Sequence, residues 1–113
     1  MKDDQVYINH ILEAIQSAEE YIAPIAGYDD FLSRENKAFR DAIVRQLEIV
    51  GEATKNLSQD FKLNHNEIPW RKVAGMRDSL IHDYGNVDLK VVWTTMKEDI
   101  LVLKELLLKI RNL

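Results

Sequence analysis

Apolar residues recur at three- and four-residue steps in four separate stretches of the 113-residue chain. This spacing puts them on one side of an α-helix, so each stretch predicts an amphipathic helix. No stretch alternates with the two-residue period of a strand, and short polar connections separate the four. The sequence therefore predicts an all-α fold: an antiparallel up-down bundle of four main helices, in a single domain over residues 1–113.

The first three expected helices span about residues 4–26, 30–57 and 69 to 82 or 84, and the last begins at Asp88 and continues for about 24 residues. Pro69 suits a first helical turn, Gly85 and Asn86 suit a helix stop, and Asp88 suits an N-cap. Residues 58–68 are polar and irregular, so we expect a loop there. The core should be formed by three stripes: Ile8, Ile11, Leu12, Ile15, Ala18, Ile22 and Ile25; Phe39, Ile43, Leu47, Val50, Ala53 and Leu57; and Leu89, Val92, Trp93, Met96, Ile100, Leu103, Leu107 and Ile110.

Two features concern how these helices pack. Gly51 lies inside the second helix, where it costs about 1 kcal/mol relative to alanine, and it either lets another helix approach closely or marks a kink. The fourth helix is apolar beyond one stripe, so self-association is the natural way to cover it. The alternative is that the other helices enclose it within one chain. Its additional apolar residues are Val91, Leu101, Val102, Leu106 and Leu108.

Composition restricts the function further. The chain has no cysteine, which excludes disulfides, thiolate metal sites and cysteine nucleophiles. No apolar run approaches the roughly 20 residues that cross a bilayer, and the first residues lack the pattern of a signal peptide. We therefore expect a cytoplasmic protein without membrane contact. The net charge of −4 excludes a broad basic surface for nucleic acid, so any RNA contact must be local.

The segment from residue 69 to 84 concentrates the distinctive chemistry. Arg77, Asp78, His82 and Tyr84 lie near the end of the third expected helix. On a regular helix, Arg77 and Tyr84 share a face and Asp78 can contact His82. A guanidinium binds phosphate oxygens, an imidazole transfers protons near neutral pH, and a phenol donates a hydrogen bond or is modified. Together these groups can cleave an RNA phosphodiester without a metal ion.

Chemistry alone leaves another interpretation open, because a single histidine near a helix C-terminus is commonly a cap that interacts with the helix dipole. One histidine also supplies only one proton-transfer group per chain. The catalytic interpretation therefore requires two copies in a symmetric dimer, so the dimer and the catalytic site are one hypothesis. His10 and His65 have no comparable neighbours and no metal-ligand spacing, and we expect neither a metal nor a cofactor.

Arg77, His82 and Tyr84 form the pattern R-x4-H-x-Y, which resembles the signature of HEPN-domain ribonucleases, and the polar Asp78 directly after the arginine also suits that pattern. The flanking segments, in the same order, resemble the HepT-like branch of that superfamily. Those segments are residues 49–58, Ile68-Pro69-Trp70-Arg71, Gly75-Met76, Val87-Asp88 and Val92-Trp93. The resemblance covers nearly the whole chain.

The resemblance implies a homodimeric ribonuclease toxin of a toxin–antitoxin pair, with the two motifs facing a shared cleft. Arg77 and His82 would be the catalytic pair of a metal-independent endoribonuclease, and Asp78 would support the site. The implied partner is an MntA-type minimal nucleotidyltransferase, which neutralises the toxin by adding AMP to the motif tyrosine, here Tyr84. A bulky, negatively charged nucleotide two residues from His82 would block RNA.

Two other hypotheses remain open from the sequence. In the first, the chain is a non-catalytic helical subunit of a minimal nucleotidyltransferase, in which Arg77 binds a phosphate and Tyr84 binds a base. Alternatively, it would be a dimerisation domain without a site, which burial of Arg77 and His82 in the core of one chain would favour. RNA cleavage in the absence of the nucleotidyltransferase distinguishes the toxin from both.

Overall fold

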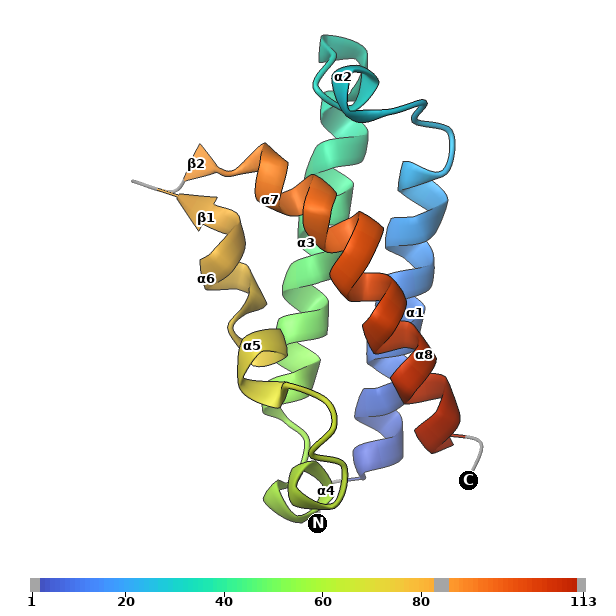
Figure 1. Ribbon diagram of the computed structural model, residues 1–113, viewed down its shortest axis with the longest axis vertical. Coiled ribbons are helices and arrows are strands. Elements are labelled where there is room, and N and C mark those ends of the chain that lie inside the picture. The colour runs from blue at the N-terminus through green and yellow to red at the C-terminus, as the bar shows by residue number, and fades with distance from the viewer. Residues whose placement is uncertain (1–2, 83–85, 112–113) are drawn as a thin grey trace.

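The computed structural model describes residues 3–82 and 86–111, and these residues are mostly helical, as the periodicity predicts. The chain runs along α1, returns along α3, comes back through α5 and α6, and returns again through α7 and α8 (Figure 1). The elements are α1 (Asp4–Ile22), α2 (Tyr28–Phe31), the 3₁₀ turn η1 (Arg34–Asn36), α3 (Lys37–Lys55), α4 (Gln59–Asn64), α5 (Trp70–Ala74), α6 (Met76–Leu80), β1 (Ile81–His82), β2 (Asn86–Val87), α7 (Leu89–Thr94), the π-helical turn η2 (Thr95–Asp99) and α8 (Ile100–Arg111).

The core lies between α1, α3 and the α7–α8 column. Every residue of the first predicted stripe, from Ile8 to Ile25, is buried. The second stripe is buried from Ile43 to Leu57, but Phe39 is 39% exposed, so its assignment to the core was wrong. Phe39 lies in the first turn of α3, where its ring packs in a tilted arrangement against that of Tyr21, with 6.3 Å between the ring centroids. Helical periodicity therefore located the core, and it failed at the end of a helix.

Gly51 brings α5 against α3. The helix α3 continues through Gly51 without interruption, which argues against the kink interpretation. A Cβ atom built on Gly51 would lie 3.3 Å from the carbonyl oxygen of Ala74 and 3.4 Å from that of Val73. Ordinary side chains rarely approach that closely, so the absence of a side chain at Gly51 allows the backbone of α5 to reach this distance. The prediction of a close helix approach is confirmed.

The third expected helix differs from its prediction. It is divided at Gly75 into α5 and α6, with Pro69 as the residue preceding α5, and it ends at Leu80 rather than at His82 or Tyr84. Ile81 has φ −94° and ψ 127°, which is extended backbone. The next residues pair as a short antiparallel ladder, with Ile81 opposite Val87 and His82 opposite Asn86. These two-residue strands are too short to produce a two-residue period in the sequence.

Residues 58–68 also differ from the expected loop, because they contain the short helix α4. Ser58 is its N-cap, and its Oγ accepts a hydrogen bond of 3.1 Å from the Phe61 amide. The Asp4 carboxylate in turn accepts hydrogen bonds of 2.7 Å from the Ser58 amide and hydroxyl. The start of α1 is therefore tied to the start of α4, which closes one end of the molecule.

The last column begins at Asp88, as predicted, since its carboxylate accepts a 3.2 Å hydrogen bond from the Val91 amide. It continues through η2 into α8, so the expected single helix contains a π-helical turn. Its inner face is buried at Val92, Met96 and Ile100, whereas Leu101 and Val102 are 47% and 58% exposed. None of the helices in the described ranges, α8 included, combines the length and apolarity that a membrane crossing requires.

Candidate functional site

The helix α6 presents its polar residues to solvent because its apolar residues anchor it. Met76 and Leu80 are four residues apart, so they lie on one face, and both are buried. Arg77, Asp78 and Ser79 lie between them and are exposed. The first two motif positions, Arg77 and Asp78, are therefore adjacent at the surface of a segment that the core holds in place.

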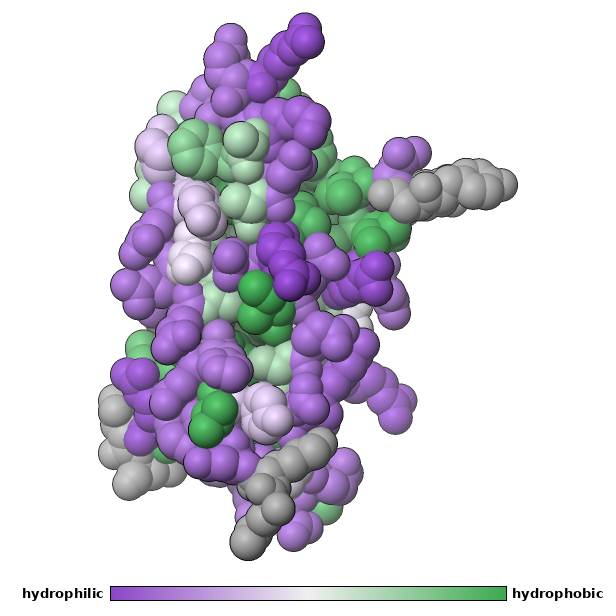
Figure 2. All heavy atoms as spheres, turned by 180° about the vertical axis from the view of Figure 1, so that it is seen from behind, coloured by the Kyte–Doolittle hydropathy of each residue, from purple (hydrophilic) through white to green (hydrophobic). Residues whose placement is uncertain are grey.

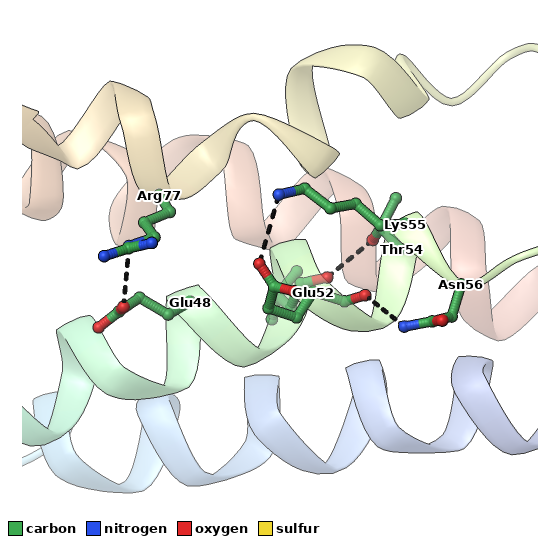
Figure 3. Close-up of polar contacts among 7 residues, drawn as sticks. Glu48, Glu52, Thr54, Lys55, Asn56 and Arg77 are labelled. Atoms are coloured by element: carbon green, nitrogen blue, oxygen red, sulfur yellow. Dashed lines mark hydrogen bonds and ion pairs between the residues drawn. The ribbon is translucent and has the colours of Figure 1, made fainter.

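Arg77 makes its charged contact with α3. Its Nε atom lies 3.3 Å from Oε2 of Glu48, and the Arg77 side chain points from α6 towards that carboxylate (Figure 3). The Arg77 side chain remains 57% exposed, whereas that of Glu48 is 26% exposed. The guanidinium is thus paired on one side and open to solvent on the other. Burial of Arg77 and His82 in the core of one chain would have favoured the dimerisation-domain hypothesis, and Arg77 is not buried.

The main chain of His82 lies in the short strand β1, which directly follows the helix α6. There His82 lies opposite Asn86, and the Asp88 amide donates a 2.8 Å hydrogen bond to the Leu80 carbonyl. Because the helix ends at Leu80, the expected four-residue contact between Asp78 and His82, and the shared face of Arg77 and Tyr84, do not follow from helical geometry. The side chain of His82 and the whole of Tyr84 lie outside the described residues.

Apolar surface lies on both sides of this region. Seen from behind, much of the molecule is polar, and several strongly hydrophobic side chains gather at the side that carries β1 and β2 (Figure 2), where Val87 is 36% exposed. A groove of about 370 Å³ lies between α5–α6 and η2–α8. Its lining is largely apolar and includes Val73, Met76, Val102 and Leu106, with Lys72 and Asp99 also lining it.

Sequence reasoning singled out Arg77 and Asp78 as site residues and missed Glu48. Glu48 lies on the expected second helix, 29 positions before Arg77 (77 − 48), and no local spacing connects the two. The available signal was indirect: Gly51, one helical turn beyond Glu48, predicted that another helix would approach there. Among the side chains that the structure describes, which exclude that of His82, no group of three or more histidine, aspartate or glutamate residues could hold a metal ion.

Comparison with known proteins identifies what this arrangement is similar to. Residues 11–110 match the family model described as "Ribonuclease HepT-like". The chain is 50% identical over 106 residues to a protein of Thermococcus cleftensis named "Probable ribonuclease HepT", which covers 94% of this chain and 94% of that protein. A Caldanaerobacter subterraneus protein, provisionally named as an RNase, is 39% identical over 88% of this chain and 87% of its own length.

One relative is a longer protein that contains a region similar to almost all of this chain. A Methanocaldococcus jannaschii protein, whose name combines a gamma-glutamylcyclotransferase with a provisional RNase, is 48% identical over 96% of this chain. The chain spans about half of that relative, 48% of its length. No solved structure matches the chain.

Proposed function

The chain belongs to the HepT-like ribonuclease family, and on that premise we propose that it is an endoribonuclease that cleaves RNA without a metal ion. The observation that carries the proposal is the exposed Arg77 guanidinium on α6, next to the segment that leads directly to His82. Both residues of the R-x4-H pair lie within the 11–110 family match. Arg77 and His82 are the proposed catalytic residues, and Asp78 is the proposed support of the site.

The proposed reaction is transfer of the phosphoryl group to the neighbouring ribose hydroxyl. One imidazole removes the proton from the 2′-hydroxyl, whose oxygen attacks phosphorus. The Arg77 guanidinium stabilises the negative charge that develops on the phosphate oxygens. A second imidazole protonates the departing 5′-oxygen. The phosphorus–5′-oxygen bond breaks, leaving a 2′,3′-cyclic phosphate and a 5′-hydroxyl end.

The need for two imidazoles is the reason to propose a homodimer. Each chain contributes one His82, so a two-fold axis near the motif would supply both the base and the acid. Leu101 and Val102 are adjacent in sequence on α8 and both exposed, which supports a partner surface because isolated chains rarely leave large apolar patches in water. The dimer also adds no net basic surface, so RNA must bind chiefly inside the cleft.

The cellular role that we propose is that of a toxin in a toxin–antitoxin pair. Its partner would be an MntA-type nucleotidyltransferase that adds AMP to Tyr84. The proposal is supported by the R-x4-H-x-Y pattern and the family membership. Mass spectrometry of the chain co-expressed with such a partner tests it, because the AMP adduct should form on the wild type and be absent from Tyr84→Phe.

RNA cleavage by the purified chain in excess EDTA tests the enzymatic proposal. The wild type should cleave RNA, and His82→Ala should reduce the rate by about 10²–10⁴-fold, the usual contribution of a general acid or base. The circular dichroism spectrum of the variant should match that of the wild type. Undiminished cleavage by His82→Ala would exclude the histidine. No cleavage by the wild type would favour the non-catalytic nucleotide-binding subunit.

A further inference from the structure

Glu48 is the acidic residue that contacts Arg77, the proposed catalytic arginine. Its Oε2 atom lies 3.3 Å from Nε of Arg77, and its side chain is 26% exposed, so the packing of α3 already restricts it. Figure 3 shows Glu48 on α3 directly facing the Arg77 side chain on α6. The remaining ion pairs of α3 in the described residues, Lys37 with Asp41 and Lys55 with Glu52, lie within that one helix.

The position of this carboxylate is determined by the same packing that determines the position of α6. Gly51 allows the carbonyl oxygens of Val73 and Ala74 to approach α3 closely, and Gly75 then connects α5 to α6. Glu48 lies one turn before Gly51 on α3, which brings it opposite the first turn of α6. The contact with Arg77 therefore follows from the backbone arrangement of two anchored helices.

The contact between Glu48 and Arg77 is better suited to orienting the guanidinium than to stabilising the fold. An ion pair with a largely exposed arginine contributes little to the free energy of folding, because solvent screens it. A guanidinium has five N–H donors in a planar fork, and the contact with Glu48 uses the Nε edge. The two terminal nitrogens carry most of the donors, and they are the groups that form a bidentate contact with the oxygens of a phosphate.

We propose that Glu48 is a positioning residue that orients the Arg77 guanidinium towards the RNA phosphate. This inference rests on the ribonuclease activity proposed above. Glu48 does not touch the substrate. It restricts the rotation of a long side chain, so that Arg77 meets the developing charge in one orientation. Its negative charge lies 3.3 Å from Nε of the arginine that binds the phosphate in the proposed reaction, so Glu48 also repels the RNA and weakens substrate binding while it improves the chemical step.

The test compares Glu48→Gln with Glu19→Gln in RNA cleavage assays in EDTA. Glu19 is a matched control: its carboxylate also bridges two helices, lying 2.9 Å from Nζ of Lys104, with 29% of the side chain exposed. Glu48→Gln should lower kcat about tenfold while KM stays constant or falls, because Arg77 is less well oriented towards the transition state and a repulsive charge is removed. Glu19→Gln should retain the wild-type kcat and KM.

A second comparison and a spectroscopic measurement separate positioning from a general structural effect. In an Arg77→Ala background, Glu48→Gln should cause no further loss of rate, because the residue on which it acts is absent. In ¹⁵N relaxation experiments, the Nε–H group of Arg77 should be more mobile in Glu48→Gln than in the wild type or in Glu19→Gln.

The outcomes distinguish this inference from the proposed function. If the wild type cleaves RNA and Glu48→Gln matches Glu19→Gln in kcat, Glu48 is not a positioning residue, although the ribonuclease proposal stands. Unchanged mobility of the Arg77 Nε–H group in Glu48→Gln overturns the positioning role independently of any activity. A wild-type chain that cleaves no RNA overturns the proposed function, and with it the role of Glu48 in that reaction.

Discussion

At the scale of single residues, the described part of the molecule contains two kinds of polar side chain. Some form hydrogen bonds that stabilise the fold, and others are exposed and can bind a ligand. The Asp4 carboxylate accepts two hydrogen bonds of 2.7 Å from Ser58 and is partly buried. Thr54 is fully buried, and its hydroxyl donates to the Val50 carbonyl at 2.8 Å. Arg77, in contrast, keeps most of its side chain in solvent. A long arginine with one ion-pair contact and open donors is a group that can still bind a ligand.

The link between Asp4 and Ser58 predicts a measurable loss of stability. Replacing Asp4 by alanine removes two charge-assisted hydrogen bonds between α1 and the cap of α4, which should lower the free energy of unfolding by about 1–3 kcal/mol. Asp41→Ala is the control, because its pair with Lys37 is exposed and should cost less than about 1 kcal/mol. Urea unfolding measures both. Equal effects of the two variants would contradict the structural role of Asp4.

At the scale of secondary-structure elements, the spacing between α3 and α5 positions the site. The Gly51 contact sets this spacing, and α6 follows α5 directly. The position of Arg77 on α6 therefore depends on a glycine of α3. The two-strand ladder then fixes the backbone of His82 by pairing it with Asn86. The proposed catalytic residues therefore depend on packing at Gly51 and pairing at Asn86, neither of which contacts RNA in the proposed reaction.

A larger side chain at Gly51 should therefore disturb both folding and catalysis. In Gly51→Val, the added methyl groups meet the carbonyl oxygens of α5, so α5 must shift, at a cost of about 1–3 kcal/mol. Arg45→Val places the same side chain at an exposed position of α3 and should cost less than about 1 kcal/mol. Thermal and urea unfolding provide the comparison. A Gly51→Val protein as stable as Arg45→Val would contradict the close approach.

These elements also show how far sequence reasoning reaches. The helical stripes from Ile8 to Ile25 and from Ile43 to Leu57 were predicted correctly, because burial leaves a regular spacing in a long helix. The end of α6 at Leu80 and the pairing of His82 with Asn86 were missed, because two-residue strands leave no period. The pair of Glu48 with Arg77 was missed because it depends on how two helices cross in space.

At the scale of the whole molecule, one chain does not cover its apolar surface. The α7–α8 column buries Val92, Met96 and Ile100 inside the chain, yet Leu101 and Val102 on α8 remain in solvent. Beside them, the groove between α5–α6 and η2–α8 continues the apolar lining through Val73 and Met76. The single histidine of the R-x4-H motif in each chain, His82, gives a second and independent reason for association. Both observations support the proposed homodimer.

The dimer predicts that a charge on α8 separates the chains without unfolding them. The wild type should have twice the 13.2 kDa mass of one chain in light-scattering chromatography, and Val102→Glu should shift it towards the single-chain mass. Leu63→Glu is the control. Leu63 is 63% exposed and lies on α4, which precedes α5, whereas α6 with the motif follows α5, so this substitution should leave the mass unchanged. The unfolding midpoints of both variants should stay close to that of the wild type. A wild type that elutes as one chain at micromolar concentration would contradict the prediction.

The proposal that RNA cleavage depends on Arg77 is tested most directly by comparing two exposed arginines on consecutive helices. The measurement is the initial rate of RNA cleavage in excess EDTA for the wild type, Arg77→Ala and Arg71→Ala, the latter being an exposed residue of α5. Arg77→Ala should lose about 10²–10³-fold in kcat, the usual effect of removing a group that stabilises the transition state, and Arg71→Ala should stay within about threefold of the wild type. Equal rates for the two variants would show that the arginine of the R-x4-H pair is not the catalytic group.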